Sequence, residues 1–404
     1  MPIKTTNIAY LAGGINYGGA PKSLLLLLKS LEKYEYKKYI YTIVNKTMDL
    51  KNEFLNFSDS FKIVDIKPII YNQIPDTNSS IISFKINSLL SNKKFVDDLL
   101  KEKIDILHVN STIFPQITKW VKKYSKIKVI THVRELIPSN GNSTISNYMI
   151  NQIKNNSDAI IAISDNEARN FYDHSNLHII PNPFDFSELG SVYSTFREDN
   201  NIDGKTVIIG MMGGAFIRYK GHLDFIFALK KIIDTKTIKH KFLFVIIGVK
   251  PKRPFWKRLF RRLLFMGNYR VTINNYIADN NLGEHIKLIP PTNDILNILK
   301  EIDIFVRPSL SGDPWGRDII EAMAMGKPVV ATGDSEFFVE NGKTGFLVPP
   351  QNPEKLSDKI SELINDPEKR DIFGKRGHEK IKKMCDLNEY GSKIHKIYHD
   401  LMDQ

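Results

Sequence analysis

Short apolar, β-branched runs alternate with amphipathic segments along the whole chain, and this alternation limits the fold more than any other feature. Segments with a helical period, such as 80–102 and 143–156, separate the runs of the first half. Those runs are 7–12, 39–44, 61–65, 104–109, 127–131 and 158–163. Short buried strands that alternate with helices are typical of parallel sheets covered on both faces. The sequence therefore predicts an α/β fold.

The same pattern then starts again in the second half, with predicted strands at 206–212, 242–247, 285–288, 302–306, 328–331 and 345–348. Each half opens with a strand, a glycine-containing loop and a helix, as in Rossmann-like units. We therefore expect two Rossmann-like domains that face each other across a cleft. The N-terminal domain would span 1–185 and the C-terminal domain 186–385, with a helix in 386–404 packing back on the N-terminal domain.

Length, charge and cysteine content narrow the class of protein. A chain of 404 residues can form two cores, and its single cysteine, Cys385, excludes an intramolecular disulfide. The apolar runs near the N-terminus are far shorter than the ~20 residues of a membrane span, so we expect a cytoplasmic protein. The formal net charge is +12, but eight basic residues and no acid lie within 250–270. A charge so localised does not predict a nucleic-acid partner.

Two acidic residues flank a loop and a helix start in the stretch DPWGRDIIEAMAMGKPVVAT, which runs over 313–332. The pattern predicts a loop, a short helix ended by Gly326, and a buried strand. A helix N-terminus favours anions, so carboxylates beside one are unexpected unless they accept hydrogen bonds from hydroxyls of the same ligand. Asp313 and Glu321 are therefore candidate hydroxyl-binding residues.

The stretch 302–350 resembles the GT-B-fold retaining glycosyltransferases, specifically glycosyltransferase family 4. The resemblance rests on an acid followed by Pro, an aromatic residue and Gly, then on Glu-Ala-Met-Ala and Gly-x-Pro-Val-Val. It implies a GT-B fold and the transfer of a hexose from a nucleotide sugar to a glycan or lipid-linked acceptor. Synthesis of a bacterial surface polysaccharide or glycolipid is the expected setting.

The family's two spaced acids correspond to Asp313 and Glu321. By resemblance, Glu321 would bind the ribose hydroxyls of the donor and Asp313 would lie beside the transferred hexose. Asp313 replaces the usual glutamate, which shortens its reach by one methylene. The backbone of Trp315, Gly316 and Arg317 would face the sugar and the diphosphate.

The resemblance also implies a cation after the first strand of the second domain. In RYKGH, Lys220 would neutralise the donor diphosphate. The family's arginine after the strand-end glycine is replaced by Ala215, so Arg218 would supply that charge. The sequence predicts a helix over 220–233, so the alternative for Lys220 is a solvated lysine at a helix start.

Five residues of the first domain complete the predicted site. By resemblance, Gly18 and Gly19 would approach the diphosphate and the acceptor, and His132 would lie near the transferred sugar. Ser164 and Asn182 match the family pattern as substrate-binding residues. Structural alternatives exist for each: a tight turn for the glycines, a structural histidine, a helix cap for Ser164 and a turn residue for Asn182.

The expected chemistry needs a way to stabilise negative charge on the leaving nucleoside diphosphate. Lys220, Arg218, the glycine-loop amides and a helix N-terminus would supply it, with domain closure as the conformational step. The chain has no Asp-x-Asp element and one cysteine, so we expect no metal and no cofactor besides the nucleotide sugar.

The segment 253–266, RPFWKRLFRRLLFM, alternates two apolar with two basic residues. As a helix it would separate an apolar face from a cationic one and bind an anionic membrane surface. This would make the protein peripheral on the inner face of the plasma membrane. Packing on its own domain or binding another protein are the alternatives.

Two other functions stay open at this point. The departures at Asp313 and Ala215 allow a catalytically inactive GT-B-fold protein that binds a glycan or a partner. The Rossmann-like pattern alone allows a dinucleotide oxidoreductase, although neither half has a clean Gly-x-Gly-x-x-Gly.

Overall fold

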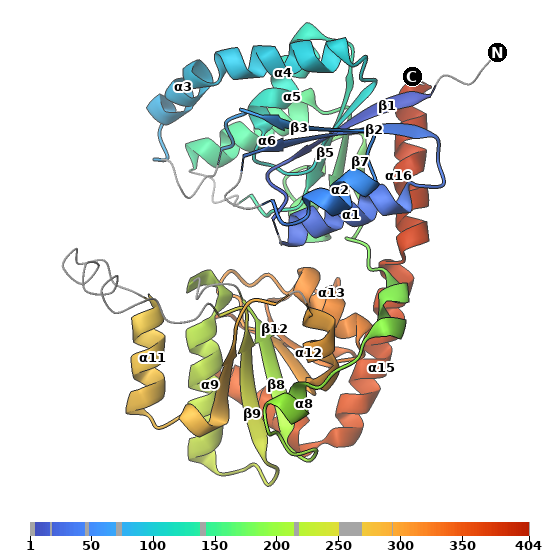
Figure 1. The fold of residues 1–404 in the computed structure, drawn as a ribbon. Helices are drawn as coiled ribbons and strands as arrows, with labels where there is room; N and C mark the ends of the chain where they lie inside the picture. The colour runs from blue at the N-terminus through green and yellow to red at the C-terminus, as the bar shows by residue number, and fades with distance from the viewer. Residues whose placement is uncertain are drawn as a thin grey trace. The chain divides into compact units, whose positions relative to one another are not determined.

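The computed structural model describes residues 5–16, 18–44, 48–69, 75–137, 143–213, 218–249, 269–292 and 294–403. The chain divides into two compact units (Figure 1). The first unit comprises Met1–Asp185 and Cys385–Gln404, and the second comprises Phe186–Met384. The C-terminal segment thus belongs to the first unit.

The first unit is built on a parallel sheet of seven strands in the order β3-β2-β1-β4-β5-β6-β7. The strands are β1 (Thr6–Ala12), β2 (Tyr36–Ile43), β3 (Ser60–Val64), β4 (Ile106–Val109), β5 (Lys128–Val133), β6 (Ala159–Ala162) and β7 (Leu177–Ile179). The helices are α1 (Gly19–Ser30), α2 (Lys51–Asn56), α3 (Asn78–Asn87), α4 (Leu89–Lys101), α5 (Pro115–Tyr124), α6 (Thr144–Asn156), α7 (Asp165–Ala168) and α16 (Leu387–Met402).

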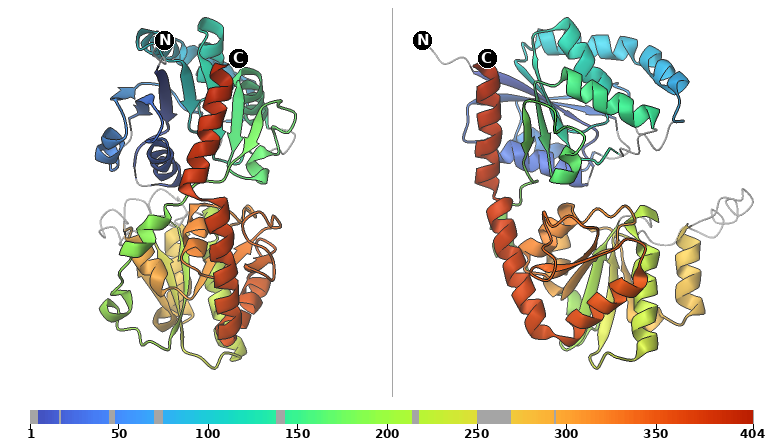
Figure 2. Two further views of the ribbon diagram at one scale, coloured as in Figure 1. Left: turned by 90° about the vertical axis from the view of Figure 1, so that its right-hand side faces the viewer. Right: turned by 180° about the vertical axis from the view of Figure 1, so that it is seen from behind.

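Strand β1 explains how this sheet is buried on both faces. Ile8 and Tyr10 pack in one cluster with residues of α1 and α16, whereas Ala9 and Leu11 pack in another with residues of α4 and α5. Successive side chains of a strand point to opposite faces, so a continuous apolar run fits a sheet between two helical layers. Figure 2 shows α16 lying along this unit, and α16 contacts α1 directly.

The second unit has a parallel six-stranded sheet in the order β10-β9-β8-β11-β12-β13. Its strands are β8 (Val207–Met212), β9 (Phe242–Ile247), β10 (Ile286–Ile289), β11 (Ile304–Arg307), β12 (Val329–Thr332) and β13 (Gly345–Val348). Its helices are α8 (Phe196–Asp199), α9 (His222–Thr235), α11 (Tyr269–Asp279), α12 (Ile295–Glu301), α13 (Arg317–Ala324), α14 (Pro353–Asn365) and α15 (Pro367–Met384). Its 3₁₀ turns are η1 (Phe186–Ser191), η3 (Arg218–Lys220) and η4 (Gly283–His285).

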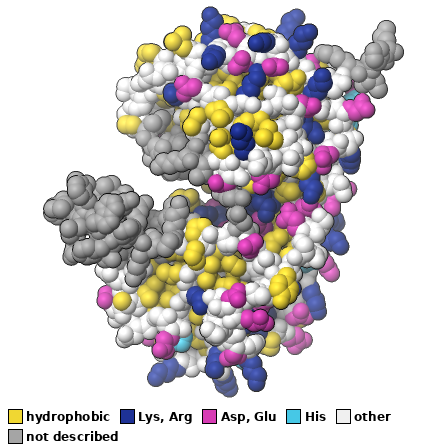
Figure 3. All heavy atoms as spheres, viewed as in Figure 1, with side chains coloured by type: hydrophobic (Ala, Val, Ile, Leu, Met, Phe, Trp, Pro, Cys, Tyr) yellow, Lys and Arg dark blue, Asp and Glu magenta, His cyan; other side chains and the backbone are white. Residues whose placement is uncertain are grey.

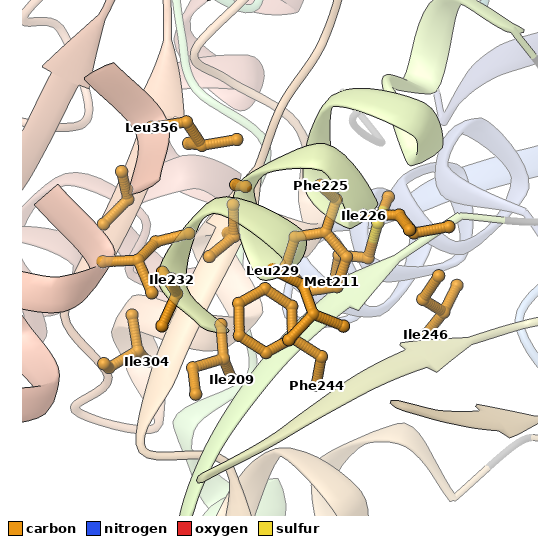
Figure 4. Close-up of a cluster of buried hydrophobic side chains, with 14 of the residues drawn as sticks. Ile209, Met211, Phe225, Ile226, Leu229, Ile232, Phe244, Ile246, Ile304 and Leu356 are labelled. Carbon is orange, nitrogen blue, oxygen red and sulfur yellow. The ribbon is translucent and has the colours of Figure 1, made fainter. Parts of the chain in front are cut away.

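A cluster of apolar side chains forms the core of the second unit (Figure 4). Phe225 and Leu229 of α9 lie over Ile209 of β8 and Phe244 of β9, and Leu356 of α14 joins the same cluster. The Phe225 and Phe244 ring centroids are 4.6 Å apart. This packing holds α9, and therefore the turn that precedes it, against the sheet.

All twelve predicted strands are present among the described residues, with small shifts at their ends. The sequence missed β7, because three residues are too few to carry a periodic pattern. It also predicted one helix over 80–102, whereas the structure has a break at Ser88. Ser88 is fully buried and its hydroxyl donates to the carbonyl of Lys85 at 3.2 Å, which competes with regular helix geometry.

Both sheets reverse their strand order at an inner strand, between β1 and β4 and between β8 and β11. In open α/β sheets, ligands bind beyond the carboxyl ends of the strands at such reversal points. The loops after β1, β4, β8 and β11 are therefore where a site is expected, and these loops contain several of the predicted residues.

None of the described helices combines the length and the apolar composition that crossing a membrane requires. On the face drawn in Figure 3, Lys and Arg side chains are interspersed with Asp and Glu side chains. The segment 253–266 lies outside the described residues.

Candidate functional site

Arg307, the last residue of β11, holds the loop that follows it. Its side chain is buried between two carboxylates. Nη2 donates to Oδ2 of Asp313 at 2.8 Å, and Nε donates to the Asp313 backbone carbonyl at 2.9 Å. Nη1 donates to both carboxylate oxygens of Asp318, at 2.7 and 2.6 Å. One guanidinium therefore fixes both the start of the loop and the first turn of α13.

The carboxylate of Asp313 is anchored on its other side by two hydroxyls. Ser311 donates to Oδ1 at 2.6 Å, and Ser309 donates to the same oxygen. Burial raises the pKa of Asp313, but the charge of Arg307 and these hydrogen bonds outweigh it and leave the pKa below its ordinary value. The side chain keeps 21% of its surface exposed. Asp313 is therefore an ionised acceptor held in one orientation.

Gly316 has a backbone conformation that the loop requires. Its φ is +150°, and a Cβ there would lie 2.5 Å from Oδ1 of Asp318 and 2.9 Å from Nη1 of Arg307. The ion pair thus packs directly against the glycine, which leads into the N-terminus of α13. Trp315, beside it, is buried.

Arg317 and Glu321 form an ion pair one helical turn apart on α13. The distance from Arg317 Nε to Glu321 Oε1 is 3.0 Å, and both side chains are more than nine-tenths buried. The predicted ribose-binding carboxylate is therefore held in place by a neighbouring cation, at the helix whose N-terminus would face the diphosphate.

The turn that carries Lys220 lies against the same loop. Leu310 donates its backbone N–H to the carbonyl of Tyr219 at 2.9 Å. Gly221 has φ +73°, and a Cβ there would overlap the backbone carbonyl of Pro308. The sequence predicted a helix from residue 220, whereas Lys220 ends η3 and α9 begins at His222. This left-handed glycine brings the Lys220 turn next to the loop of Asp313.

Arg218 also lies in η3, and its predicted role in charge neutralisation stays a prediction. Gly214 and Ala215, where the family arginine is missing, lie outside the described residues.

A second polar cluster lies in the first unit, around Arg134. This buried guanidinium donates from Nε to Oδ1 of Asn110 at 2.7 Å and from Nη1 to Oδ1 of Asn182. Nη2 lies 3.3 Å from Nδ1 of His132. Asn110 also donates to the carbonyl of Ala20 at 3.4 Å, in the first turn of α1. The structure thus brings His132 and Asn182 together, beside the helix that Gly18 and Gly19 begin.

Ser164 does not join this cluster. It is the N-cap of α7, accepting from the backbone N–H of Asn166 at 3.2 Å and donating to the carboxylate of Glu167. Within the described residues, the contacts of Ser164 are those of a helix cap. Its role in substrate binding stays a prediction. Asn182, by contrast, is a buried partner of Arg134 and not a simple turn residue.

His132 and His108 are fully buried next to each other, with Nδ1 of His132 3.1 Å from Nε2 of His108. Burial and the charge of Arg134 lower the pKa of His108 to about 3. Burial, with Arg134 and His108, lowers the pKa of His132 well below its ordinary value. Both imidazoles are therefore neutral in the folded protein near neutral pH.

This burial predicts a loss of stability of the first unit in mild acid. The unfolded chain binds protons to these histidines below about pH 6.5 and the folded chain does not, so folding becomes less favourable as pH falls from 6.5 toward 3. At pH 5.5 each histidine should lower the free energy of unfolding by up to about 1.4 kcal/mol. Hydrogen exchange of the β4 and β5 amides at pH 7.5 and 5.5, corrected for intrinsic exchange rates, measures this loss of stability. The amides of β9, in the second unit, are the reference. Equal protection at both values would contradict it.

Gly18 offers a test of the glycine loop. It is the N-cap of α1 with φ −172°, a conformation open to any residue. A Cβ there would meet only ordinary contacts, the nearest being Pro21 Cδ at 3.7 Å. Gly18→Ala should therefore lower the free energy of unfolding by no more than about 1 kcal/mol. If the loop approaches a diphosphate, the same variant should bind donor at least about tenfold more weakly. Thermal melting and donor titration separate the two effects, and unchanged donor affinity would favour the tight-turn alternative.

Sequence reasoning missed Arg307, Arg134, Asn110 and His108. Each lies at or next to the carboxyl end of an inner strand, which is the signal that would have found them. Their partners are distant in sequence, so their pairing could not be seen without the fold.

Two family models match the chain in adjacent segments that together include most of it. Glycosyltransferase Family 4 matches residues 17–188, and Glycosyl transferases group 1 matches residues 192–380. An uncharacterized glycosyltransferase of Methanocaldococcus jannaschii is 26% identical over 385 residues, which cover 90% of this chain and 94% of that protein. The UDP-Gal:alpha-D-GlcNAc-diphosphoundecaprenol alpha-1,3-galactosyltransferase of Escherichia coli is 27% identical over 243 residues, which cover 57% and 56% of the two chains.

Solved structures share the fold over nearly the full length. HepE of Anabaena, in complex with UDP and glucose, matches with a TM-score of 0.77 and 18% identity, covering 98% of this chain and 100% of that one. Sucrose-phosphate synthase of Thermosynechococcus elongatus matches with a TM-score of 0.73 and 18% identity, covering 98% and 99%.

Proposed function

Because this chain belongs to the GT-B-fold glycosyltransferases, we propose that it moves a hexose from a nucleotide sugar to a glycan or lipid-linked acceptor, with retention of anomeric configuration. The glycosyl-transfer role follows from the family. The donor class, the hexose and the retaining outcome are the proposal, and the arrangement of Arg307, Asp313, Arg317 and Glu321 at the start of α13 is the observation that supports it most.

The second unit would bind the donor. Glu321, oriented by Arg317, offers carboxylate oxygens to the two ribose hydroxyls. The turn of Lys220 contacts the loop that leads into α13, and Lys220 and the N-terminus of α13 would neutralise the diphosphate. In the described residues Lys220 has no carboxylate partner, and its Nζ lies 5.8 Å from the centroid of the Tyr219 ring. Asp313, ionised and oriented, would accept a hydrogen bond from a sugar hydroxyl.

The reaction would break the bond between the anomeric carbon and the diphosphate oxygen and form a bond from that carbon to an acceptor oxygen. Positive charge develops on the sugar and negative charge on the leaving diphosphate. Lys220, Arg218 and the amides at the α13 N-terminus would stabilise the leaving group. The acceptor hydroxyl would lose its proton to a phosphate oxygen of that group. In the first unit, His132 would donate a hydrogen bond to the sugar. The N-terminus of α1, with Gly18 and Gly19, would approach the diphosphate or the acceptor.

The acceptor and the cellular setting are part of the proposal. The Escherichia coli relative is named for a lipid-linked diphosphate acceptor, which favours a lipid-linked or surface-polysaccharide acceptor here. We propose cytoplasmic synthesis at the inner face of the membrane, with 253–266 binding anionic lipid. We also propose transfer without a metal, since Lys220, Arg218 and the amides at the N-terminus of α13 would supply the positive charge that neutralises the diphosphate.

Thermal shift with a donor panel tests the proposal. UDP-, GDP- and ADP-hexoses, the free nucleotides, the free sugars and NAD would each be added with and without EDTA. We expect one nucleotide family to raise the Tm of the wild-type protein, the nucleotide sugar to raise it more, and EDTA to leave both shifts unchanged. A Tm raised by NAD alone would overturn the proposal and favour a dinucleotide oxidoreductase.

The inactive binding protein remains the second candidate, because three of the roughly four hydrogen-bonding positions of the Asp313 carboxylate are already taken by Arg307 and the two serines. Donor binding without sugar release or transfer over a panel of acceptors would support that candidate. Donor binding with release of the nucleoside diphosphate would exclude it.

A further inference from the structure

A row of hydrogen-bonded side chains joins the C-terminal helix α16 to His132. The hydroxyl of Tyr398 on α16 lies 2.7 Å from Nδ1 of His108 on β4. Nε2 of His108 lies 3.1 Å from Nδ1 of His132 on β5. All three side chains are fully buried, and the Tyr398 ring meets the His108 ring edge-on. The row lies entirely within the first unit.

Arg134 decides which nitrogen of His132 carries the hydrogen. A guanidinium has donors and no acceptor, and its Nη2 lies 3.3 Å from Nδ1 of His132. Nδ1 must therefore be the acceptor in this contact. In a neutral imidazole the hydrogen is then on Nε2.

The assignment of His132 then fixes that of His108. Its Nε2 faces the accepting Nδ1 of His132, so it must carry hydrogen, and Nδ1 of His108 must then accept. The partner of that Nδ1 is the Tyr398 hydroxyl, which stays protonated because burial raises the pKa of Tyr398 well above its ordinary value. The Tyr398 hydroxyl is also placed to donate to the Tyr10 hydroxyl, at 3.4 Å, but it has one proton, and the shorter distance of 2.7 Å favours donation to His108.

We propose that Tyr398 and His108 are positioning residues which, with Arg134, fix His132 as the Nε2–H tautomer and present it as a neutral hydrogen-bond donor to an oxygen of the substrate. Nε2 of His132 is buried and has no hydrogen-bond partner among the described residues, as expected of a donor reserved for a ligand. The identity of that ligand rests on the proposed function; the tautomer does not.

This assignment has a mechanistic consequence. A histidine whose Nδ1 is occupied and whose Nε2 carries hydrogen cannot accept the acceptor's proton. His132 is then a binding residue for a sugar oxygen, and proton removal falls to the leaving phosphate. It also gives α16 a role in the site, since the hydroxyl that starts the row comes from the C-terminal end of the chain.

Nitrogen NMR of protein labelled with ¹⁵N-histidine tests the tautomer directly. We expect the wild-type His132 signals, assigned by their loss in His132→Gln, to show a protonated Nε2 and an unprotonated Nδ1. Tyr398→Phe keeps the ring and removes the hydroxyl, so His108 loses the donor that fixes its own tautomer. His108 should then show a mixture of tautomers, and His132, held only by the 3.3 Å contact with Arg134, should lose part of its preference for the Nε2–H form. A wild-type His132 protonated on Nδ1 would overturn the proposal whatever the variants do.

Tyr36→Phe is the matched control. The Tyr36 hydroxyl lies 2.6 Å from Nδ1 of His395, so this variant also removes a tyrosine–histidine contact to α16, but outside the row. We expect it to leave the His132 signals and donor turnover unchanged, while Tyr398→Phe lowers kcat/KM about fivefold to tenfold. If Tyr398→Phe behaves like Tyr36→Phe in both measurements, the positioning role is wrong. If the tautomers are as predicted but no nucleotide sugar is turned over, the proposed function fails and the fixed tautomer stands.

Discussion

Glu321→Gln should abolish most of the sugar transfer. It also leaves the buried Arg317 guanidinium without its carboxylate, so some stability of the second unit should be lost, and the rates are compared at a temperature where the variant is folded. The substitution keeps the size of the side chain but removes the charge that would accept hydrogen bonds from two ribose hydroxyls. Each such bond to a charged group contributes about 1.5–3 kcal/mol, so kcat/KM for the donor should fall about a hundredfold or more. Steady-state rates with the donor identified by thermal shift measure the effect.

Glu301→Gln provides the control for this variant. Glu301 also pairs with an arginine of the second unit, with 3.0 Å between its Oε2 and Nε of Arg197, the same distance as in the Arg317–Glu321 pair. It lies away from the loop of Asp313. We expect Glu301→Gln to keep wild-type kcat/KM, and equal activity of the two variants would remove Glu321 from the site.

Arg307→Met should destabilise the second unit and weaken donor binding together. The variant leaves the buried carboxylates of Asp313 and Asp318 without the cation between them. Breaking a buried ion pair on one side costs about 3–5 kcal/mol, which corresponds to a fall of roughly 10 °C in Tm. The pKa of Asp313 should also rise, because the charge of Arg307 is a main reason for its lowered value. Calorimetry and donor titration measure the two consequences.

Arg307→Lys and Arg197→Met are the control variants for Arg307→Met. Lysine keeps the charge but cannot form the forked contacts to both aspartates, so it should recover only part of the stability and affinity. Arg197 pairs with Glu301 and Asp303 but is more exposed, and its loss should cost less and leave donor affinity unchanged. Wild-type donor affinity in Arg307→Met would contradict the idea that Arg307 shapes the donor site.

The sheets could be predicted from the sequence because their strands are continuous apolar runs, buried on both faces. The reversal of strand order, however, depends on pairings such as Ile8 with Ile106 that no local pattern specifies. Local propensity also failed where a single residue decides the geometry. Gly221 in a left-handed conformation moved the start of α9 past Lys220, and Ser88 divided one predicted helix into two.

The candidate site was predictable to the extent that its residues lie within one short motif. Asp313, Trp315, Gly316, Arg317 and Glu321 were found together because they are neighbours in sequence. The residues that orient them and their counterparts in the first unit were not found, because their partners are distant in the chain. Arg134 joins positions 110, 132 and 182, and Tyr398 reaches His108 across 290 residues.

The most direct test of the central claim is the release of nucleoside diphosphate from the stabilising nucleotide sugar, measured for wild-type protein and Glu321→Gln with and without EDTA. We predict release by the wild-type protein, faster with an acceptor lipid or glycan, unchanged by EDTA and at least about a hundredfold slower in the variant. Equal release by wild type and variant, or no release from any donor that binds, would contradict a glycosyl transfer carried out at this site.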